Sequence, residues 1–229
     1  MRIISHRANI DGPNPSTENS LNSIERAFAS GFGIETDIRF SKNCGFYISH
    51  NLADFSSATN AKYHTALWRK YNHCPVALNI KELGHENKLV NFLISEKVIN
   101  QILLFDMELI ERNPGETAKF FRQINPMLKL AARVSDRGES IDRALNIECA
   151  DYIWLDEFDT LWATQEDIQR LKNSGKVVYA ISPELHGFSM IQATQRWLQF
   201  LSWGVDGICT DWPIYLASEL SKIRQEITQ

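Results

Sequence analysis

The sequence lacks the features that define membrane, secreted and nucleic-acid-binding proteins. Its 229 residues contain no apolar run of signal-peptide length after the N-terminus. They also contain no run of about 18 apolar residues, which a membrane-spanning helix needs. The 24 Lys and Arg against 28 Asp and Glu give a net charge of −4, which argues against a basic surface for nucleic acid or anionic lipid. We therefore expect a cytoplasmic protein with no nucleic-acid partner and no membrane segment.

Paired cysteines and the common nucleotide and hydrolase motifs are also missing. The four cysteines lie far apart at Cys44, Cys74, Cys149 and Cys209. Without C-x-x-C spacing they predict neither a structural zinc site nor a disulfide framework, so we expect four free thiols, mostly buried. There is no Walker-type phosphate loop, no G-x-S-x-G elbow and no H-E-x-x-H helix.

Short apolar runs alternate with longer amphipathic stretches along the whole chain, as in repeated βα units. Strands are expected at residues 3–5, 33–38, 76–80, 101–105, 127–131, 152–155, 177–181 and 207–209, with a short extended piece at 46–49. Helices are expected at residues 21–29, 86–94, 116–123, 141–145, 165–173, 192–203 and 214–227. Eight strands, nearly all followed by a helix, predict a single (β/α)₈ TIM barrel. No Gly/Ser-rich linker divides residues 1–229, so we expect one domain.

Two acidic side chains stand two residues apart on the second expected strand. Alternation places Glu35 and Asp37 on the same face, and in a barrel that face leads to the catalytic end. Two neighbouring carboxylates repel each other unless a cation or a proton lies between them. Oxygen ligands on a rigid strand suit Mg²⁺ or Ca²⁺, so we favour a metal site over a solvent-facing pair.

Two histidines follow extended segments at the same expected end of the barrel. His6 comes after the first strand, and His50 follows the short extended piece. Because a histidine exchanges protons near neutral pH, two of them facing each other across a metal would form an acid–base pair. Either histidine alone is more often an ordinary surface residue.

These residues also belong to a series of short motifs whose order along the chain is recognisable. The order His6-Arg7, Glu18-Asn19-Ser20, Gly31 through Glu35-x-Asp37, and His50 resembles the signature of the glycerophosphodiester phosphodiesterases. The segment from Gly204 to Pro213, GVDGICTDWP, resembles the closing segment of that family. The two blocks bracket almost the whole chain.

The resemblance implies a metal-dependent phosphodiesterase acting on a small-molecule diester. Glu35 and Asp37 would hold the divalent ion, and Arg7 and Lys81 would bind the phosphate oxygens. One of His6 and His50 would activate the nucleophile, and the other would protonate the leaving alkoxide. The resemblance leaves open whether Glu18 and Asn19 bind substrate and metal or hold the first loop.

Three departures from the family pattern are visible. The family's E-x-K segment is Asn79-Ile80-Lys81 here, so the third metal ligand would be the uncharged amide of Asn79 unless Glu82, Asp106, Asp156 or Glu184 replaces it. The usual His-Asp pair is His50-Asn51, and Asn can orient a histidine without raising its basicity. The seventh-strand tryptophan segment is replaced by the stretch ISPELHG, which contains Glu184 and His186.

Further polar residues follow the later strands. Asp156 is a candidate for polyol recognition or for a place around the metal. Glu184 and His186 either form hydrogen bonds to a sugar or polyol or belong to a capped loop that enters the next helix, with His186 exposed. Arg133 and Arg137 could bind a second phosphate, but a surface salt-bridged turn is the expectation.

Two other functions stay open. A barrel that binds a phosphate compound without turnover is motivated by Asn51 and Asn79. A phospholipase D-like barrel that releases a cyclic phosphate also uses two histidines and one metal. The sequence does not specify an oligomeric state.

Overall fold

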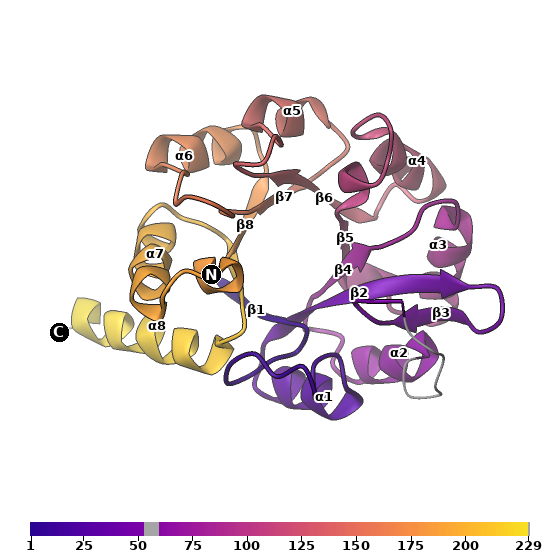
Figure 1. The fold of residues 1–229 in the computed structure, drawn as a ribbon, viewed down its shortest axis with the longest axis horizontal. Coiled ribbons are helices and arrows are strands. Elements are labelled where there is room, and N and C mark those ends of the chain that lie inside the picture. The colour runs from indigo at the N-terminus through magenta and orange to yellow at the C-terminus, as the bar shows by residue number, and fades with distance from the viewer. Residues whose placement is uncertain (53–59, 229) are drawn as a thin grey trace.

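The strands of this protein close into a parallel barrel. The computed structural model describes residues 1–52 and 60–228. In this part of the chain nine strands form one sheet in the order β1-β9-β8-β7-β6-β5-β4-β2-β3, and β1 also pairs with β2. Barrel neighbours are parallel, whereas β3 is antiparallel to the outer end of β2 (Figure 1). The strands are β1 (Arg2–His6), β2 (Gly33–Ser41), β3 (Gly45–Ile48), β4 (Val76–Ile80), β5 (Ile102–Phe105), β6 (Lys129–Val134), β7 (Tyr152–Leu155), β8 (Val177–Ile181) and β9 (Gly207–Thr210). The expected (β/α)₈ TIM barrel is confirmed.

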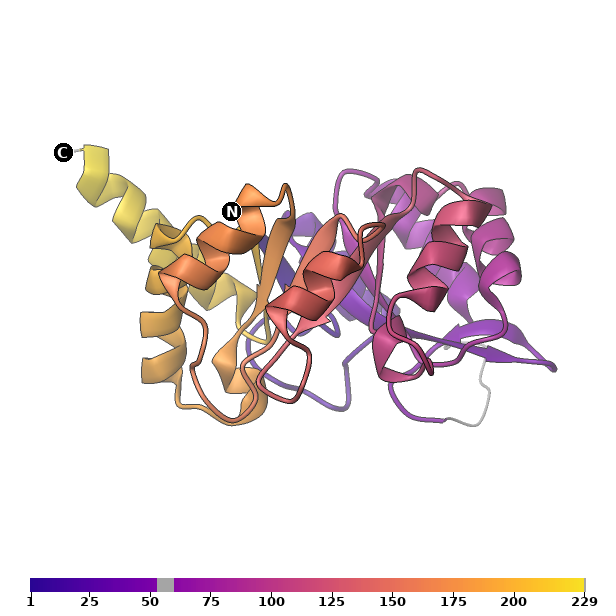
Figure 2. The same cartoon turned by 90° about the horizontal axis from the view of Figure 1, so that it is seen from above.

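The helices form a ring around the barrel (Figure 1), and the strands run obliquely between them (Figure 2). The α-helices are α1 (Leu21–Ala29), α2 (Ala61–Lys70), α3 (Glu86–Ser95), α4 (Glu116–Ile124), α5 (Ile141–Asn146), α6 (Gln165–Asn173), α7 (Met190–Ser202) and α8 (Pro213–Thr228). Short 3₁₀ turns are η2 (Ile99–Gln101), η3 (Met107–Leu109) and η4 (Pro183–His186). Capping boxes at Thr164 and Ser189 satisfy free backbone N–H groups where α6 and α7 begin.

Two parts of the sequence-based prediction were wrong. Helix α2 was missed, because its buried residues are largely polar or small apart from Trp68. Its start is fixed by Asn60, whose side chain accepts a hydrogen bond from the backbone N of Lys62. The strand expected at residues 127–131 is β6, which begins at Lys129 and runs to Val134, whereas Met127 is 82% exposed.

The core consists of two layers. A large layer lies between the barrel and the helices and includes the fully buried Trp68 and Trp197. A smaller layer fills the barrel interior, where the rings of Phe105 and Trp154 stack with centroids 4.1 Å apart. Bulky apolar side chains in the interior are typical of TIM barrels, which are packed rather than hollow. The interior layer therefore separates the two ends of the barrel.

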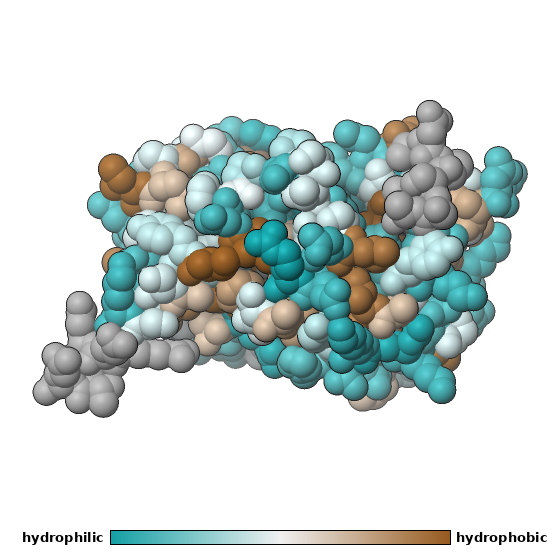
Figure 3. Space-filling view, turned by 90° about the horizontal axis from the view of Figure 1, so that it is seen from below, coloured by the Kyte–Doolittle hydropathy of each residue, from teal (hydrophilic) through white to brown (hydrophobic). Residues whose placement is uncertain are grey.

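None of the described helices is both long enough and apolar enough to cross a membrane. All four cysteines are free, as expected, although Cys44 and Cys149 are only half-buried. On the side of the molecule in Figure 3, apolar residues form separate patches with polar residues between them. The cytoplasmic location stays a prediction.

Candidate active site

Strand register brings the predicted residues to the carboxyl-terminal end of the barrel, which we call the mouth. His6 on β1 is the register partner of Glu35 on β2, and Asp37 is the partner of Asn79 on β4. Alternation along β2 turns Thr36 the other way, where its hydroxyl donates to the Asn19 side chain at 2.6 Å. The β2 carboxylates therefore share the inner face, as the sequence predicted.

The mouth contains a cavity of about 270 Å³ between the two halves of the barrel. Residues from the predicted site line one half: His6, Arg7, Glu35, His50, Asn79 and Lys81. Polar residues of the later strands and loops line the other half: Asp106, Arg133, Asp156 and His186. Phe105 and Trp154 from the interior layer complete the cavity wall. Six side chains chosen from sequence therefore share a cavity with two further candidates, Asp156 and His186.

Glu35 and Asp37 are buried and surrounded by basic groups. The backbone N of Arg7 donates to Glu35 Oε2 at 3.3 Å, and Lys81 Nζ lies 2.9 Å from Asp37 Oδ1. Burial, together with the negative charge of Asp37, raises the pKa of Glu35 to about 7, although nearby His6, Arg7 and Lys81 oppose the rise. A proton on Glu35 near neutral pH therefore relieves the repulsion between the two carboxylates.

Two oxygen atoms beside this pair have no hydrogen-bond partner. Asp37 Oδ2 and Asn79 Oδ1 are both buried and accept no hydrogen bond from a described residue, although Arg7 Nε lies 3.9 Å from Asp37 Oδ2 as an ion pair. Within residues 1–52 and 60–228, no three His, Cys, Asp or Glu side chains converge as a metal site. The candidate set Glu35, Asp37 and Asn79 contains two carboxylates and one amide. All three present oxygen, the donor that hard divalent cations prefer.

His6 is held in place by a carboxylate from the far end of the chain. Its Nδ1 lies 2.9 Å from Asp211 Oδ1, and Asn9 Nδ2 donates to the same oxygen at 2.8 Å. Burial works to lower the pKa of His6, but the hydrogen bond to Asp211 and the negative charges of Glu35 and Asp211 outweigh burial and raise it. Its other ring nitrogen, Nε2, lies 3.9 Å from Glu35 Oε2.

His50 is oriented by its neighbour. Its Nδ1 lies 3.1 Å from Asn51 Oδ1, and two nitrogens of Arg39 donate to the His50 carbonyl. Burial lowers the pKa of His50, and the positive charges of Arg7 and Lys81 act in the same direction, against the charge of Asp37. The two histidines therefore differ in proton affinity, with His6 the more basic.

The opposite half of the mouth is organised by a buried arginine, which corrects one expectation. Arg133 is 8% exposed and donates to Asp106 through Nε and Nη2, each at 2.7 Å. Its Nη1 donates to Asp156, whose other oxygen lies 2.7 Å from His186 Nε2. Arg133 therefore does not lie in the surface turn that the sequence predicted. Because β6 continues to Val134, Arg133 is part of the strand and its side chain is buried at the mouth. Arg137 does form a surface pair, with Asp159.

Three predicted residues support the site from outside the cavity wall. Glu18 pairs with Arg7 Nη1 at 3.3 Å. Asn19 adopts a left-handed conformation with φ 57°, and its backbone O contacts His64 Nε2 at 3.0 Å, so it fixes the first loop. Glu184 accepts hydrogen bonds from Thr210 Oγ1 and from the backbone N of Asp211, so it fixes the segment that carries Asp211.

Sequence reasoning missed the roles of Asp211 and Asp106. Asp211 lies in the closing segment GVDGICTDWP and follows β9 directly, so the rule that chemistry follows the strands could have selected it. Asp106 was considered only as a replacement metal ligand. It instead accepts from Asn79 Nδ2 at 2.8 Å and binds Arg133.

The fold and the mouth define a TIM-barrel protein with an acid- and histidine-lined cavity where such barrels carry their chemistry. No protein-family model matches the sequence, and no curated protein matches it. The chain resembles the structure of a glycerophosphoryl diester phosphodiesterase from Parabacteroides distasonis, with a TM-score of 0.74 and 16% identity over 97% of this chain and 86% of that one. It also resembles an Oleispira antarctica phosphodiesterase in complex with its product sn-glycerol-3-phosphate, with a TM-score of 0.68 and 16% identity over 96% and 97% of the two chains.

The structure of a different kind of enzyme also resembles this chain. A tryptophan synthase α-subunit from Pyrococcus furiosus matches with a TM-score of 0.58 and 14% identity over 96% of both chains. The phosphodiesterase structures thus match better than a barrel of different chemistry, and the comparisons establish the fold.

Proposed function

We propose that this protein is a phosphodiester hydrolase acting on a glycerophosphodiester or a related polyol- or sugar-phosphate diester. The observation that carries the proposal is that His6, His50, Glu35, Arg7 and Lys81 line one cavity at the mouth. The shared fold with phosphodiesterases, one of them bound to sn-glycerol-3-phosphate, supports it. Fold alone does not specify chemistry, so the argument depends on the side chains in the cavity.

Glu35, Asp37 and Asn79 would hold a divalent cation, Mg²⁺ or Ca²⁺. The buried oxygens of Asp37 and Asn79 that accept no hydrogen bond support this assignment, as does the raised pKa of Glu35. When bound, the ion would polarise the phosphodiester and stabilise negative charge on its oxygens. One uncharged ligand out of three predicts weaker binding than a site with three carboxylates would give.

Arg7 and Lys81 would bind the non-bridging phosphate oxygens. Both line the cavity, and both reach toward Asp37, with Arg7 Nε 3.9 Å from Oδ2 and Lys81 Nζ 2.9 Å from Oδ1. They would thus hold the phosphate next to the acidic pair. Charge-assisted hydrogen bonds from arginine and lysine to phosphate are among the stronger polar contacts in proteins.

His6 and His50 would move the protons of the reaction. One histidine takes a proton from the nucleophile, which is water or the hydroxyl next to the phosphate, as its oxygen forms a bond to phosphorus. The other gives a proton to the leaving alkoxide as the bond between phosphorus and the leaving oxygen breaks. The anchoring of Nδ1 by Asp211 in His6 and by Asn51 in His50 leaves Nε2 of each ring for this transfer.

The opposite half of the mouth would bind the alcohol part of the substrate. Arg133 is already neutralised by Asp106 and Asp156, so it has little charge to offer a second phosphate. Asp156 and His186 offer hydrogen-bonding groups to hydroxyls, and the ring of Phe158 packs on His186 at 4.2 Å. This combination favours an uncharged polyol or sugar over a second phosphate group.

Hydrolysis of bis(p-nitrophenyl) phosphate and of glycerophosphoglycerol tests the proposal. Wild type, His6→Ala, His50→Ala and the matched control His85→Ala would be assayed with Mg²⁺, Mn²⁺ or Ca²⁺ and after EDTA. His85 does not line the mouth, and its ring packs on Phe40 with centroids 4.0 Å apart. We expect metal-dependent turnover that falls by about 10²- to 10⁴-fold in the two mouth variants and stays at the wild-type level in the control.

Other results would select the alternatives. Release of a cyclic phosphate without further hydrolysis, seen by ³¹P NMR, would favour the phospholipase D-like reaction. Absence of turnover on both diesters, in a protein that still binds the diester in calorimetry, would indicate a binding barrel and overturn the proposed hydrolase.

A further inference from the structure

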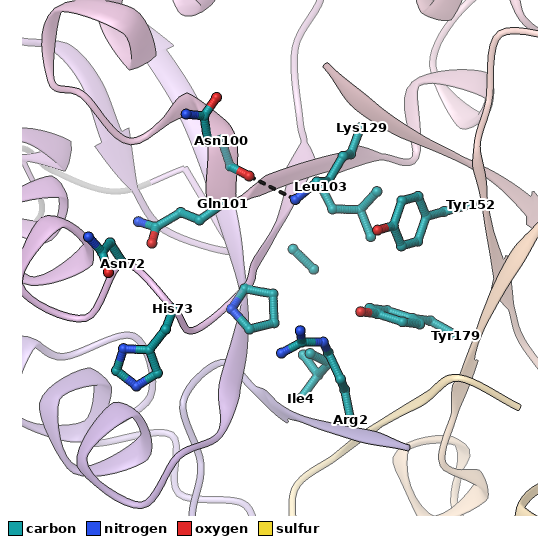
Figure 4. Close-up of a pocket in the computed structure, with 12 residues that line it drawn as sticks. Arg2, Ile4, Asn72, His73, Asn100, Gln101, Leu103, Lys129, Tyr152 and Tyr179 are labelled. Carbon is teal, nitrogen blue, oxygen red and sulfur yellow. Dashed lines mark hydrogen bonds between the residues drawn. The ribbon is translucent and has the colours of Figure 1, made fainter. Parts of the chain in front are cut away.

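A second cavity, of about 130 Å³, lies at the opposite end of the barrel from the mouth (Figure 4). Residues at the starts of strands line it, including Arg2 on β1, Lys129 on β6 and Tyr152 on β7. Ile4 and Leu103 of the interior layer form its apolar part. It shares no lining residue with the cavity at the mouth, and the interior layer lies between them. We call this space the lower cavity.

Two cations face the lower cavity without a counter-ion. Among the described residues, neither Arg2 nor Lys129 has a carboxylate within ion-pair distance, whereas Asp151 and Asp206 nearby are each paired with another cation. Lys129 Nζ donates to the carbonyl of Asn100 at 2.7 Å, which positions it (Figure 4). Burial and the charge of Arg2 lower the pKa of Lys129, as expected where positive charge is not compensated.

A buried amide of the lower cavity has no partner. Gln101 is 7% exposed, and neither its Nε2 nor its Oε1 forms a hydrogen bond in the described structure. A polar side chain at this depth is normally satisfied by protein, ordered water or ligand. About 10–15 Å³ suffices for one water molecule, so a cavity of about 130 Å³ has room for a small molecule.

Two phenol groups complete the donor set. The rings of Tyr152 and Tyr179 meet edge to face with centroids 5.4 Å apart, and both hydroxyls point toward the middle of the cavity (Figure 4). Neither hydroxyl hydrogen-bonds to another residue that the structure describes. A Cβ on Gly207 would lie 2.8 Å from the Tyr179 ring, so the chain has a glycine where this ring needs the space.

We propose that the lower cavity binds a phosphate group, either as free phosphate or as the terminal group of a small phosphorylated molecule. Among the described residues, the cavity wall contains Arg2 and Lys129 and no carboxylate, so its charge favours an anion over a cation. Two positive charges, with hydroxyl and amide donors around them, match the charge and the many acceptor oxygens of phosphate.

Calorimetric titration tests this site in a background where the mouth is weakened. Inorganic phosphate and, separately, methyl phosphate would be titrated at constant ionic strength into Lys81→Met and into three double variants. These add Lys129→Met, Gln101→Leu or, as a matched control, Lys42→Met in the exposed β2–β3 turn. Gln101→Leu removes an unpaired buried amide, so that variant is expected to fold.

We expect Lys81→Met to retain one phosphate site. Adding Lys129→Met should weaken this site by about tenfold or more, Gln101→Leu should weaken it measurably, and Lys42→Met should change it less than about twofold. Binding of methyl phosphate would identify a phosphorylated molecule as the ligand, and binding of inorganic phosphate alone would identify the free ion. Loss of all binding in Lys81→Met, or equal binding with and without Lys129, would overturn the proposal.

Discussion

His6 Nδ1 lies 2.9 Å from Asp211 Oδ1, although the two residues are 205 positions apart in the sequence. His6 ends the first strand of the barrel, and Asp211 directly follows the last. Closure of the barrel makes this contact possible, because β9 pairs with β1. The carboxylate fixes the ring and stabilises its protonated form. Such a partner commonly sets both the tautomer and the basicity of a functional histidine.

Asp211→Asn tests this role. The amide keeps an acceptor for the imidazole and removes the charge, so the pKa of His6 should fall. We expect kcat/KM for the diester to decrease by about 10- to 100-fold, and the limb of the pH–rate profile that belongs to His6 to move to lower pH. A purely structural role for Asp211 would reduce the rate without moving that limb.

Asn51→Asp changes the second histidine in the opposite direction. Asn51 Oδ1 lies 3.1 Å from His50 Nδ1, and a carboxylate there would stabilise the imidazolium. The pKa of His50, which burial lowers in the wild type, should rise. We expect the limb assigned to His50 to move to higher pH, measured as kcat/KM between pH 5 and 9. His50→Ala/Asn51→Asp is the control, and a shift that survives in it would belong to another group.

The sequence predicted the half of the mouth that depends on short-range patterns. Glu35 and Asp37 could be placed on one face because the strand around them is apolar and alternates. The other half depends on where β6 ends. The predicted strand ended at residue 131 and left Arg133 in a turn. The observed strand β6 extends to Val134, so Arg133 is a strand residue and forms ion pairs with Asp106 and Asp156.

Contacts between residues far apart in the sequence could not be predicted from local patterns. The partner of His6 depends on barrel closure, and no local propensity encodes it. Helix α2 was missed because two of its four buried residues are the polar His64 and Thr65, so its buried face does not stand out as apolar and packing against β3 and α1 stabilises it. Tertiary structure therefore determines both the His6–Asp211 contact and the formation of helix α2.

Asn79→Asp tests the proposed metal set. The Asn79 amide donates to Asp106 Oδ2 at 2.8 Å, and a carboxylate would turn this hydrogen bond into a repulsion. In EDTA we expect a loss of about 1–3 kcal/mol in the free energy of unfolding. With Mg²⁺ or Ca²⁺ the added charge should tighten binding on the order of tenfold and restore stability. The measurements are urea unfolding with and without metal and calorimetry of the metal.

Asn79→Ala is the matched control for that variant. It removes the ligand without adding charge, so it should weaken metal binding while avoiding the repulsion with Asp106. Equal metal affinity in wild type, Asn79→Ala and Asn79→Asp would show that position 79 does not contact the ion.

The buried carboxylate of Glu108 should make the free energy of unfolding depend on pH. Its carboxylate is buried and accepts from the backbone N of Arg133, and burial raises its pKa from 4.5 to about 7. Because the folded-state pKa is raised, the contribution of this group is fully present below pH 4.5 and is lost as the pH rises through about 7. Glu108→Gln keeps an acceptor and carries no charge, so its stability relative to wild type should increase by up to about 3 kcal/mol between pH 5 and pH 8.

Urea unfolding of wild type and Glu108→Gln at pH 5 and pH 8 measures this difference. Glu148→Gln, at an exposed position, controls for the change in net charge and should show no comparable pH-dependent gain. If Glu108→Gln differs from wild type by the same amount at both pH values, Glu108 is ionised throughout this range. Its buried charge would then be stabilised by Arg133, whose backbone N it accepts from and whose positive charge favours the ionised form.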